Sequence, residues 1–380
     1  MKKNWLVVST GFALFAMFFG SGNLVFPIAV GQESEGHFLM GSLGILLTGV
    51  LVPFLGVFGM MLYNGDLRSF FSCFGKTGTF WFSLFALSLM GPFGVLARCL
   101  TVMHGALQLL FNNLSLPMTS FILCAIIFGF TVNKSKIVSV LGNMLTPFLL
   151  VAIAVLAFFG LQHGVSSEML NDGAFKAFTN GFFQGYQTMD LLAAFFFSTF
   201  VINYLKKAFH DEPNEGKSIN VFLKASLVGG FILSSVYVAL VMLGWSYSSV
   251  LVNQPPQAML GMIAMEALGP FAAPVVCALI VLACLTTGIV LTSLFADFLR
   301  KEVSKEKLGN KQALLITLAI GFAISTLEFS GIAAFIGPIL EATYPALIVL
   351  TIVNIAHKLL GVKSSHWPVT LTLAAKLCWV

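Results

Sequence analysis

The chain has 380 residues, of which 58% are hydrophobic and only 9% are charged, and its mean hydropathy is +0.95. Because soluble domains carry roughly a quarter charged residues, this composition excludes a soluble globule and predicts an all-α protein that crosses the membrane many times. The net charge of +5 is explained by where the lysines and arginines lie, so neither an acidic partner nor nucleic acid is expected. The six cysteines lie mostly in apolar segments without metal-ligand spacing, which predicts reduced core residues.

Hydrophobic segments follow one another along the whole chain. A helix that crosses about 30 Å of hydrocarbon needs roughly 20 residues. Eleven segments are candidates, near 5–30, 38–62, 79–111, 117–132, 138–161, 178–205, 219–244, 270–299, 312–328, 332–357 and 365–380. Lys2 and Lys3 resemble the start of a signal peptide, but no small-residue cleavage site follows, so the first segment is expected to remain as a helix. Since no linker divides the chain, we predict one transmembrane domain over residues 1–380.

The basic residues sort to one side of these segments. If the N-terminus is cytoplasmic, 17 of the 20 lysines and arginines fall near cytoplasmic ends, including the group at 300–311. The connections on the other side carry acidic residues such as Glu33, Glu35 and Glu266. Because cytoplasmic loops carry an excess of lysine and arginine, the N-terminus is predicted to be cytoplasmic.

The first segment contains a stretch that disfavours a continuous helix. Residues 18–27 read Phe-Phe-Gly-Ser-Gly-Asn-Leu-Val-Phe-Pro. Gly20 and Gly22 each lower helix propensity by about 1 kcal/mol, and Pro27 cannot donate to the carbonyl of Asn23. Backbone groups freed at membrane depth are tolerated only where they line a cavity enclosed by protein. The stretch therefore predicts an interrupted helix that forms half of a binding site.

A second patch of glycine and polar residues occupies 180–190 of the sixth segment. Segments one and six lie five helices apart, so they cross the membrane in opposite directions. Two interrupted helices of opposed orientation are typical of an inverted-repeat transporter with a site near the membrane midplane. We therefore predict a 5+5 repeat with discontinuous helices one and six. The repeats cover about 5–161 and 178–357, and an extra helix covers 365–380.

Interrupted helices offer both kinds of polar backbone group. The half-helix after each break presents free N–H groups, which suit a carboxylate. The half-helix before it presents carbonyls, which suit a cation or an ammonium group. A zwitterionic amino acid needs both. The phenylalanines around the breaks would form an apolar pocket, although contact with lipid or another helix is the alternative for each ring; they are Phe15, Phe18, Phe19, Phe26, Phe195, Phe196 and Phe197.

The eighth segment contains a candidate cation site. Ala283, Thr286 and Thr287 are spaced i, i+3 and i+4, so they share one helix face. Two hydroxyls and the Ala283 carbonyl would supply part of an oxygen shell, and carbonyls of Ala16 and Phe19 would complete it. The alternative is structural, because threonines in membrane helices often bond to the carbonyl four residues earlier.

Three charged residues inside the segments are candidates for coupling or gating. A charged side chain at the helix centre costs about 2.5–3.5 kcal/mol on insertion scales. Asp190 would act as a proton carrier, a cation ligand or a gate, or it would stabilise the start of the second half-helix through the helix dipole. Arg98 and Glu341 are the other two, and a purely structural pair between Arg98 and a carboxylate is an alternative for Arg98.

Four stretches together resemble a known family. Residues 18–27, Gly91-Pro92, 185–190 and Leu-Glu-Ala-Thr-Tyr-Pro at 340–345 are similar to the bacterial branched-chain amino acid:cation symporters, which have the LeuT-type fold of the APC superfamily. The resemblance implies sodium-coupled import of leucine, isoleucine and valine through the bacterial inner membrane by alternating access. Na+ would be the coupling ion, the lipid bilayer the surroundings, and no cofactor is expected.

The resemblance also implies positions for the two sites. Sodium would bind at Ala16, Phe19, Ala283, Thr286 and Thr287. Substrate contacts would fall on Ser21, Gly22, Asn23, Gly185, Tyr186, Gln187 and Thr188.

The chain departs from the family pattern in three places, and other functions stay open. Ala97-Arg98-Cys99 stands where Pro-Arg-Thr is expected, no carboxylate follows at 103–105, and the eleventh segment is short where the family has a twelfth. Proton coupling through Asp190, another hydrophobic or aromatic amino acid as substrate, and a channel are the alternatives. An enzyme is not expected, because the histidines are dispersed and form no ligand pattern. The sequence predicts no oligomeric state.

Overall fold

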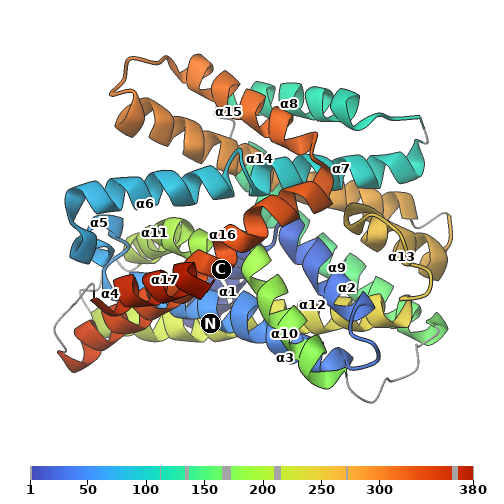
Figure 1. Cartoon of the computed structure of the whole chain (residues 1–380), viewed down its shortest axis with the longest axis horizontal. Helices are drawn as coiled ribbons and strands as arrows, with labels where there is room; N and C mark the ends of the chain where they lie inside the picture. The colour runs from blue at the N-terminus through green and yellow to red at the C-terminus, as the bar shows by residue number, and fades with distance from the viewer. Residues whose placement is uncertain are drawn as a thin grey trace.

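The computed structural model describes residues 2–111, 113–132, 137–164, 173–208, 215–270, 273–361 and 367–379. Within these residues the only regular secondary structure is helix, and many helices run roughly along the long axis of the molecule (Figure 1). Each of the eleven expected segments contains helix. Residues 365, 366 and 380 of the last expected segment lie outside the described residues.

The first half of the chain contains five of the expected segments, and the first of them is interrupted near its middle. The first segment comprises α1 (Lys2–Phe18) and α2 (Ser21–Gln32), and the second comprises α3 (Phe38–Leu46), η1 (Leu47–Leu51) and α4 (Val52–Leu62). The short α5 (Leu67–Phe70) and η2 (Ser72–Phe74) lead to α6 (Gly75–Met90) and α7 (Val95–Leu110). The half ends with α8 (Leu116–Val132) and α9 (Ile137–His163). The interruption between α6 and α7 was not predicted and falls on Gly91-Pro92.

The second half of the chain contains the remaining six expected segments. It begins with an interrupted helix, α10 (Ala174–Gln187) and α11 (Asp190–Ala208), followed by α12 (Glu215–Ser246). A connection with η3 (Pro256–Ala258) and α13 (Met259–Leu268) leads to α14 (Ala273–Phe298) and η4 (Leu299–Val303). The chain continues through α15 (Asn310–Ser325), α16 (Glu328–Leu360) and α17 (Trp367–Trp379).

Length and apolarity identify membrane-crossing helices among the described residues. Five satisfy both criteria: Phe38–Leu62, Ser72–Leu110, Asn220–Ser246, Pro274–Val303 and Glu328–Leu360. The bent pair of α1 and α2 qualifies as a sixth when it is taken as one span. Large apolar side chains also face outward, for example Phe231 at 75% exposure and Leu227 at 74%. The chain is therefore a multi-pass membrane protein.

Helix contacts place the interrupted helices inside the bundle. α1 and α2 pack along α12, and α10 and α11 pack along α3 and α4. α9 packs on α12 and α14, whereas α16 packs on α4 and α7. α7 pairs with α14, and α8 pairs with α15. If each helix of one half is exchanged for its expected counterpart in the other, these contacts correspond to one another.

Two glycines allow the outer halves of the interrupted helices to approach their partners. A Cβ atom on Gly31 of α2 would lie 1.9 Å from the Val241 carbonyl oxygen of α12. A Cβ atom on Gly181 of α10 would lie 2.2 Å from the Gly41 carbonyl oxygen of α3. Neither position has room for a side chain, so both contacts depend on glycine.

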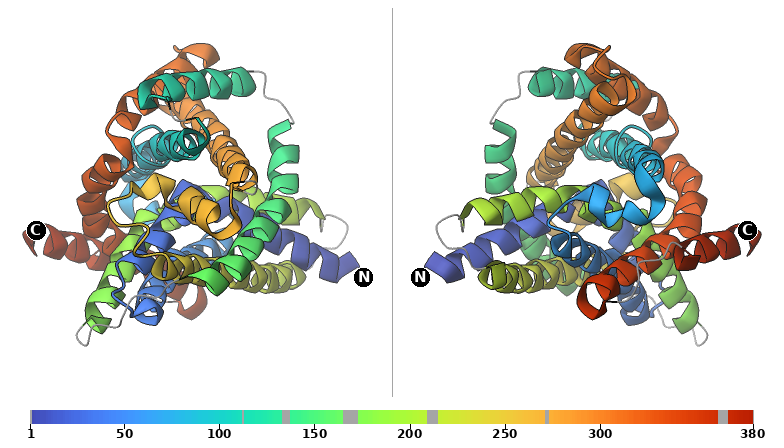
Figure 2. Two further views of the ribbon diagram at one scale, coloured as in Figure 1. Left: turned by 90° about the vertical axis from the view of Figure 1, so that its right-hand side faces the viewer. Right: turned by 90° about the vertical axis from the view of Figure 1, so that its left-hand side faces the viewer.

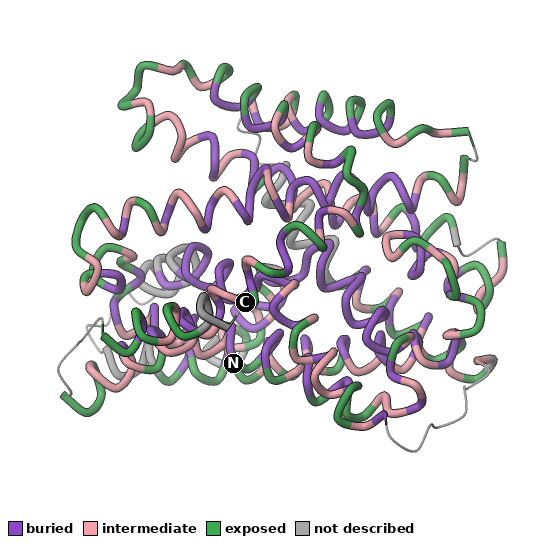
Figure 3. The backbone as a smooth tube through the Cα atoms, viewed as in Figure 1, coloured by how far each residue is buried: buried purple, intermediate pink, exposed green. Residues whose placement is uncertain are grey.

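Burial is greatest around the centre of the bundle (Figure 3). α2 is buried from Ser21 to Gly31, and α7 is buried from Leu96 to Ala106. The end-on views show α8, α15 and α17 at the periphery (Figure 2). Polar residues of α2 and α7 are therefore shielded from the surroundings by other helices.

Charged residues divide between the two ends of the bundle. One end contains α5, η4 and the C-terminus of α16, which carry Arg68, Lys301 and Lys358 (Figure 1). The other end contains the connection from α2 to α3 and also α13, which carry Glu33, Glu35 and Glu266. The two charge groups of the sequence thus lie at opposite ends of the structure.

Candidate functional site

The predicted interruption of the first helix is confirmed. α1 ends at Phe18 and α2 begins at Ser21, and the two helices meet at an angle of 75°. Gly20 has extended backbone angles (φ −131°, ψ −163°), and its N–H donates to Asn23 Oδ1 at 3.0 Å. Pro27 does not take part, since α2 continues through it. The break therefore lies at Phe19 and Gly20, at the start of the stretch 18–27 that predicted it.

The sixth segment is also interrupted, at Thr188 and Met189. Met189 has φ +60°, an uncommon value for a residue other than glycine. Thr188 Oγ1 donates to the Gly185 carbonyl at 2.9 Å. Gly185 itself lies within α10, where it packs against Thr48 of η1 rather than forming the break.

The two breaks lie against each other. A Cβ atom added to Gly22 would lie 3.3 Å from Thr188 Cα. Gly22 thus has almost no free space on that side, and its lack of a side chain permits the approach. The structure brings together the two halves of the predicted site.

A buried carboxylate connects the breaks. Asp190, the first residue of α11, is 3% exposed. Asn23 Nδ2 donates to Asp190 Oδ2 at 2.7 Å and contacts Tyr237 Oη at 2.6 Å. The Tyr237 hydroxyl of α12 donates to the same carboxylate oxygen at 3.1 Å. No ion pair involves Asp190 among the described residues, so neutral donors and the positive end of the α11 dipole surround it.

Arg98 lies on the other side of the break in the sixth segment, at the C-terminus of α10. It is 1% exposed, and its Nη1 and Nη2 atoms donate to the carbonyl oxygen and to Oε1 of Gln187, both at 2.6 Å. The guanidinium also lies over the rings of Phe26 and Phe329, with its carbon 5.0 and 5.6 Å from their centroids. The purely structural pair with a carboxylate, which was the alternative for Arg98, is absent among the described residues. Arg98 instead binds the last carbonyl of α10, where the helix dipole is negative.

Gln187 connects three helices. Besides its two bonds to Arg98 of α7, its Nε2 donates to the Ala333 carbonyl of α16 at 3.4 Å. Its polar atoms therefore already have protein partners, whereas the sequence analysis placed Gln187 among the substrate contacts.

Three aromatic residues of the site were not predicted. They are Tyr237 of α12 and two residues of α16, Phe329 and Tyr344. The ring of Tyr344 lies 4.8 Å from that of the predicted contact Tyr186. No spacing pattern distinguishes these rings in a chain with 39 phenylalanines and 6 tyrosines. The Leu-Glu-Ala-Thr-Tyr-Pro stretch, which contains Tyr344, was the only signal.

Three polar atoms near the breaks are buried and have no partner among the described residues. They are Ser21 Oγ, Arg98 Nε and Tyr344 Oη. A buried polar group without a partner costs about 1–3 kcal/mol. Unsatisfied polar atoms on three helices that meet at two helix breaks indicate a site for a polar ligand.

The threonines of α14 lie beside the first break. A Cβ atom on Gly20 would be 3.6 Å from Thr287 Cγ2. The hydroxyls of Thr286 and Thr287 donate to the Ala283 carbonyl at 2.9 and 3.0 Å, which is the geometry of the structural alternative. Phe19 is buried and stacks on Phe15 at 4.9 Å.

The remaining two predicted residues differ in position. Ala16 is half-buried in the last turn of α1, just before the break. Glu341 is exposed on α16, and its charge acts on Tyr186. The structure therefore does not bring Glu341 into the buried cluster of Asp190.

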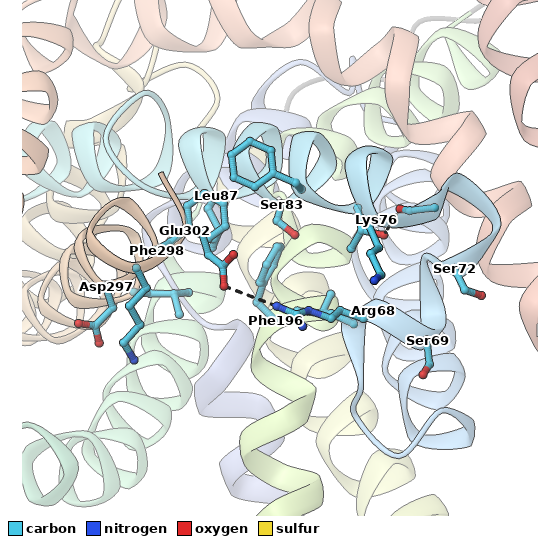
Figure 4. Close-up of a pocket in the computed structure, with 16 residues that line it drawn as sticks. Arg68, Ser69, Ser72, Lys76, Ser83, Leu87, Phe196, Asp297, Phe298 and Glu302 are labelled. Carbon is cyan, nitrogen blue, oxygen red and sulfur yellow. Dashed lines mark hydrogen bonds and ion pairs between the residues drawn. The ribbon is translucent and has the colours of Figure 1, made fainter. Parts of the chain in front are cut away.

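A cavity of about 920 Å³ opens at the end of the bundle that contains α5 and η4. Its lining includes Ser83 and Leu87 of α6 and Phe196 of α11, which lie deeper in the bundle than the charged rim (Figure 4). At the other end, η3 packs across α2, α7 and α16. The cavity thus opens at one end of the bundle, and η3 packs across helices at the other; the residues of the two breaks do not line the cavity.

The rim of the cavity is held by hydrogen bonds and one ion pair. Asp66 caps α5 by accepting from the Arg68 backbone N–H at 3.0 Å and from the Ser69 hydroxyl at 2.6 Å. The bond from Ser69 contributes most to holding the pKa of Asp66 below its usual value. Arg68 faces Glu302 of η4, with Nη2 3.7 Å from Oε1 (Figure 4). Since both side chains are exposed, this pair adds little to stability.

Comparisons with known proteins agree with this geometry. A family model described as branched-chain amino acid transport protein matches residues 2–379. Two putative branched-chain amino acid carrier proteins of Staphylococcus aureus are each 28% identical to the chain. SAR1419 of strain MRSA252 matches over 96% of this chain and 84% of its own length, and SAB1263c of strain bovine RF122 / ET3-1 matches over 100% and 90%.

Solved structures share the fold. The inward-facing conformation of Mhp1 aligns with a TM-score of 0.65 at 15% identity, covering 92% of this chain and 77% of Mhp1. A manganese transporter of Eremococcus coleocola aligns with a TM-score of 0.57 at 15% identity, covering 98% of this chain and 85% of that transporter. At these identities the two structures show the fold alone.

Proposed function

Because this chain belongs to the branched-chain amino acid transport protein family, we propose that it is a secondary active symporter that imports leucine, isoleucine and valine with Na+ by alternating access. The family and the fold are those of membrane transporters and not of enzymes. The observation that carries the proposal is the contact between two interrupted helices, made where Gly22 meets Thr188.

The polar groups around the breaks suit a zwitterion. The first N–H groups of α2, at 21–23, have no helical partner and lie beside the unpaired Ser21 hydroxyl, so they favour a carboxylate. Arg98 binds the C-terminal carbonyl of α10. The carbonyls at the C-terminus of α1 and the Asp190 carboxylate therefore remain to bind a positively charged group. The rings of Phe26 and Phe329, 5.4 Å apart, supply an apolar surface for an aliphatic side chain.

Sodium is assigned to the end of α1 and the adjacent face of α14, at Ala16, Phe19, Ala283, Thr286 and Thr287. The contact between Gly20 and Thr287 supports this assignment because it places the hydroxyl face beside the freed carbonyls. A hydroxyl that donates to Ala283 still has lone pairs for a cation. The bonds seen in the structure therefore accommodate ion binding.

The architecture we propose is two inverted repeats, over about 5–161 and 178–357, followed by an extra helix at 365–380. The recurrence of helix contacts after exchange of the halves supports the repeat. The separation of basic and acidic ends supports a cytoplasmic N-terminus in a bacterial inner membrane. With that orientation the cavity lined by Ser83 and Phe196 opens to the cytoplasm.

Uptake into proteoliposomes tests the sodium assignment. Radiolabelled leucine uptake is expected to rise with an inward Na+ gradient. Thr287→Val, which removes a hydroxyl at nearly constant volume, is expected to raise the half-saturating Na+ concentration about tenfold, the equivalent of about 1.4 kcal/mol.

Thr326→Val is the matched control, because Thr326 is exposed and its hydroxyl bonds only to the nearby Ala323 carbonyl. Its sodium dependence should equal that of the unmodified protein. Equal leucine uptake in K+ and Na+ gradients would remove the sodium assignment.

Proton coupling is the second candidate, and the burial of Asp190 favours it. A carboxylate with no cationic partner among the described residues is suited to carry a proton. Accumulation driven by a pH gradient without Na+ would select this candidate. A competition panel of hydrophobic and aromatic amino acids, with and without Na+, distinguishes a different substrate from a different coupling ion.

A further inference from the structure

Tyr344 has a buried hydroxyl whose hydrogen has no acceptor among the described residues. The residue lies in α16 and is 0% exposed; the backbone N–H of Leu192 in α11 faces its Oη, but no described group accepts a hydrogen bond from it. Buried tyrosine hydroxyls usually find a partner. An acceptor atom of a bound ligand would satisfy this hydroxyl.

The hydroxyl lies at the break of the sixth helix. The Tyr344 ring packs against Tyr186, the second-last residue of α10, at 4.8 Å between centroids. The charges of both Asp190 and Arg98 act on the hydroxyl. α16 also packs directly on α7 and α10. Tyr344 therefore faces the same buried region as the two charged residues at the break.

The unsatisfied groups in this region are donors. Arg98 Nε carries a hydrogen and cannot accept, and the hydroxyls of Ser21 and Tyr344 each have a hydrogen to donate. Several acceptors nearby already receive hydrogen bonds: Asp190 Oδ2 receives two, and both oxygens of Gln187 receive one each from Arg98. The partner that is missing is thus an acceptor, and an anionic one suits the adjacent guanidinium best.

We propose that the Tyr344 hydroxyl donates a hydrogen bond to the carboxylate of the transported amino acid, with Arg98 Nε–H beside it. This inference rests on the proposed function as an amino acid transporter and specifies how the substrate is recognised. It requires the protein to discriminate between an amino acid and the corresponding amide, because the amide lacks the negative charge.

Tyr344→Phe tests the inference because it removes one oxygen and keeps the ring against Tyr186. Inhibition of radiolabelled leucine uptake is measured with leucine and with leucinamide. In the unmodified protein, leucine is expected to inhibit far more strongly. In Tyr344→Phe the inhibition constant of leucine is expected to rise about tenfold and that of leucinamide to stay constant. The inhibition constant of leucinamide divided by that of leucine therefore falls about tenfold.

Tyr247→Phe is the matched control, because its hydroxyl donates to the Gly160 carbonyl at 3.0 Å in a contact between other helices. It should leave the ratio unchanged. If Tyr344→Phe transports too slowly, stabilisation of the purified protein against heating by each compound gives the same ratio. If Tyr344→Phe weakens inhibition by leucine and by leucinamide equally, or weakens neither, the inference is overturned.

Failure of the proposed function gives a different result. If the unmodified protein prefers another amino acid over leucine, the branched-chain assignment fails. The ratio of the two inhibition constants, measured with the amide of the preferred amino acid and with that amino acid itself, then still decides whether Tyr344 contacts the carboxylate.

Discussion

Asp190→Asn is expected to abolish concentrative uptake of leucine. The substitution removes the negative charge that the protein holds between the breaks, where Asn23 and Tyr237 donate to it. The cation that would neutralise this charge, whether Na+ or H+, then loses its electrostatic attraction in a buried site. Removal of one partner of a buried charge pair costs about 3–5 kcal/mol. Gradient-driven uptake in proteoliposomes is therefore expected to fall by about a hundredfold or more.

Exchange of leucine across the membrane separates coupling from folding in this variant. Asp190→Asn should still exchange internal for external leucine, because the side chain retains an oxygen that accepts from Asn23. Asp297→Asn is the matched control, since Asp297 lines the cavity at the charged end of the bundle (Figure 4). Gradient-driven accumulation by Asp190→Asn at the unmodified level would contradict a role in coupling.

Arg98→Met is expected to lower the stability of the protein and eliminate uptake. It leaves the carbonyl oxygen and Oε1 of Gln187 buried without their donors. Each unpaired buried acceptor costs about 1–3 kcal/mol, so the loss of both lowers the free energy of unfolding by several kcal/mol. Arg98→Lys keeps the charge but not the two-pronged geometry, and an intermediate effect is expected. The measurements are the midpoint of thermal unfolding in detergent and the rate of leucine uptake.

Arg68→Met serves as the comparison for this variant. Its side chain is 78% exposed and forms only the 3.7 Å pair with Glu302. Exposed pairs contribute about 0–1 kcal/mol, so the midpoint should move little. An Arg98→Met protein with the same midpoint and uptake as Arg68→Met would show that the bonds to Gln187 are dispensable.

The sequence predicted the interruptions of the first and sixth segments, but not the atoms that cause them and not the break between α6 and α7. Gly20 adopts the extended backbone that ends α1, as glycine in a hydrophobic segment suggests. Pro27 does not mark the break. It leaves the Asn23 carbonyl without a donor, but other contacts hold α2 together through this position. In the sixth segment the glycines allow close helix packing, and the turn falls on Met189 with a positive φ that no sequence pattern indicates.

The partners of the charged residues were not predictable, because they lie far apart in the chain. Asn23 and Asp190 are separated by 167 positions, and Asp190 and Tyr237 by 47. Hydrophobic periodicity identifies helices but not which of their faces meet. For Arg98 the sequence offered a carboxylate pair as one alternative, whereas the tertiary structure supplies the carbonyl at the end of α10.

The most direct test is a cryo-electron microscopy map of the protein with leucine and NaCl. Density for leucine is expected between residues 21–23 of α2 and the turn at Thr188 and Met189, with the leucine carboxylate near Tyr344. A map in which the first and sixth helices run unbroken, or in which leucine occupies only the cavity beside Ser83 and Leu87, would contradict this expectation.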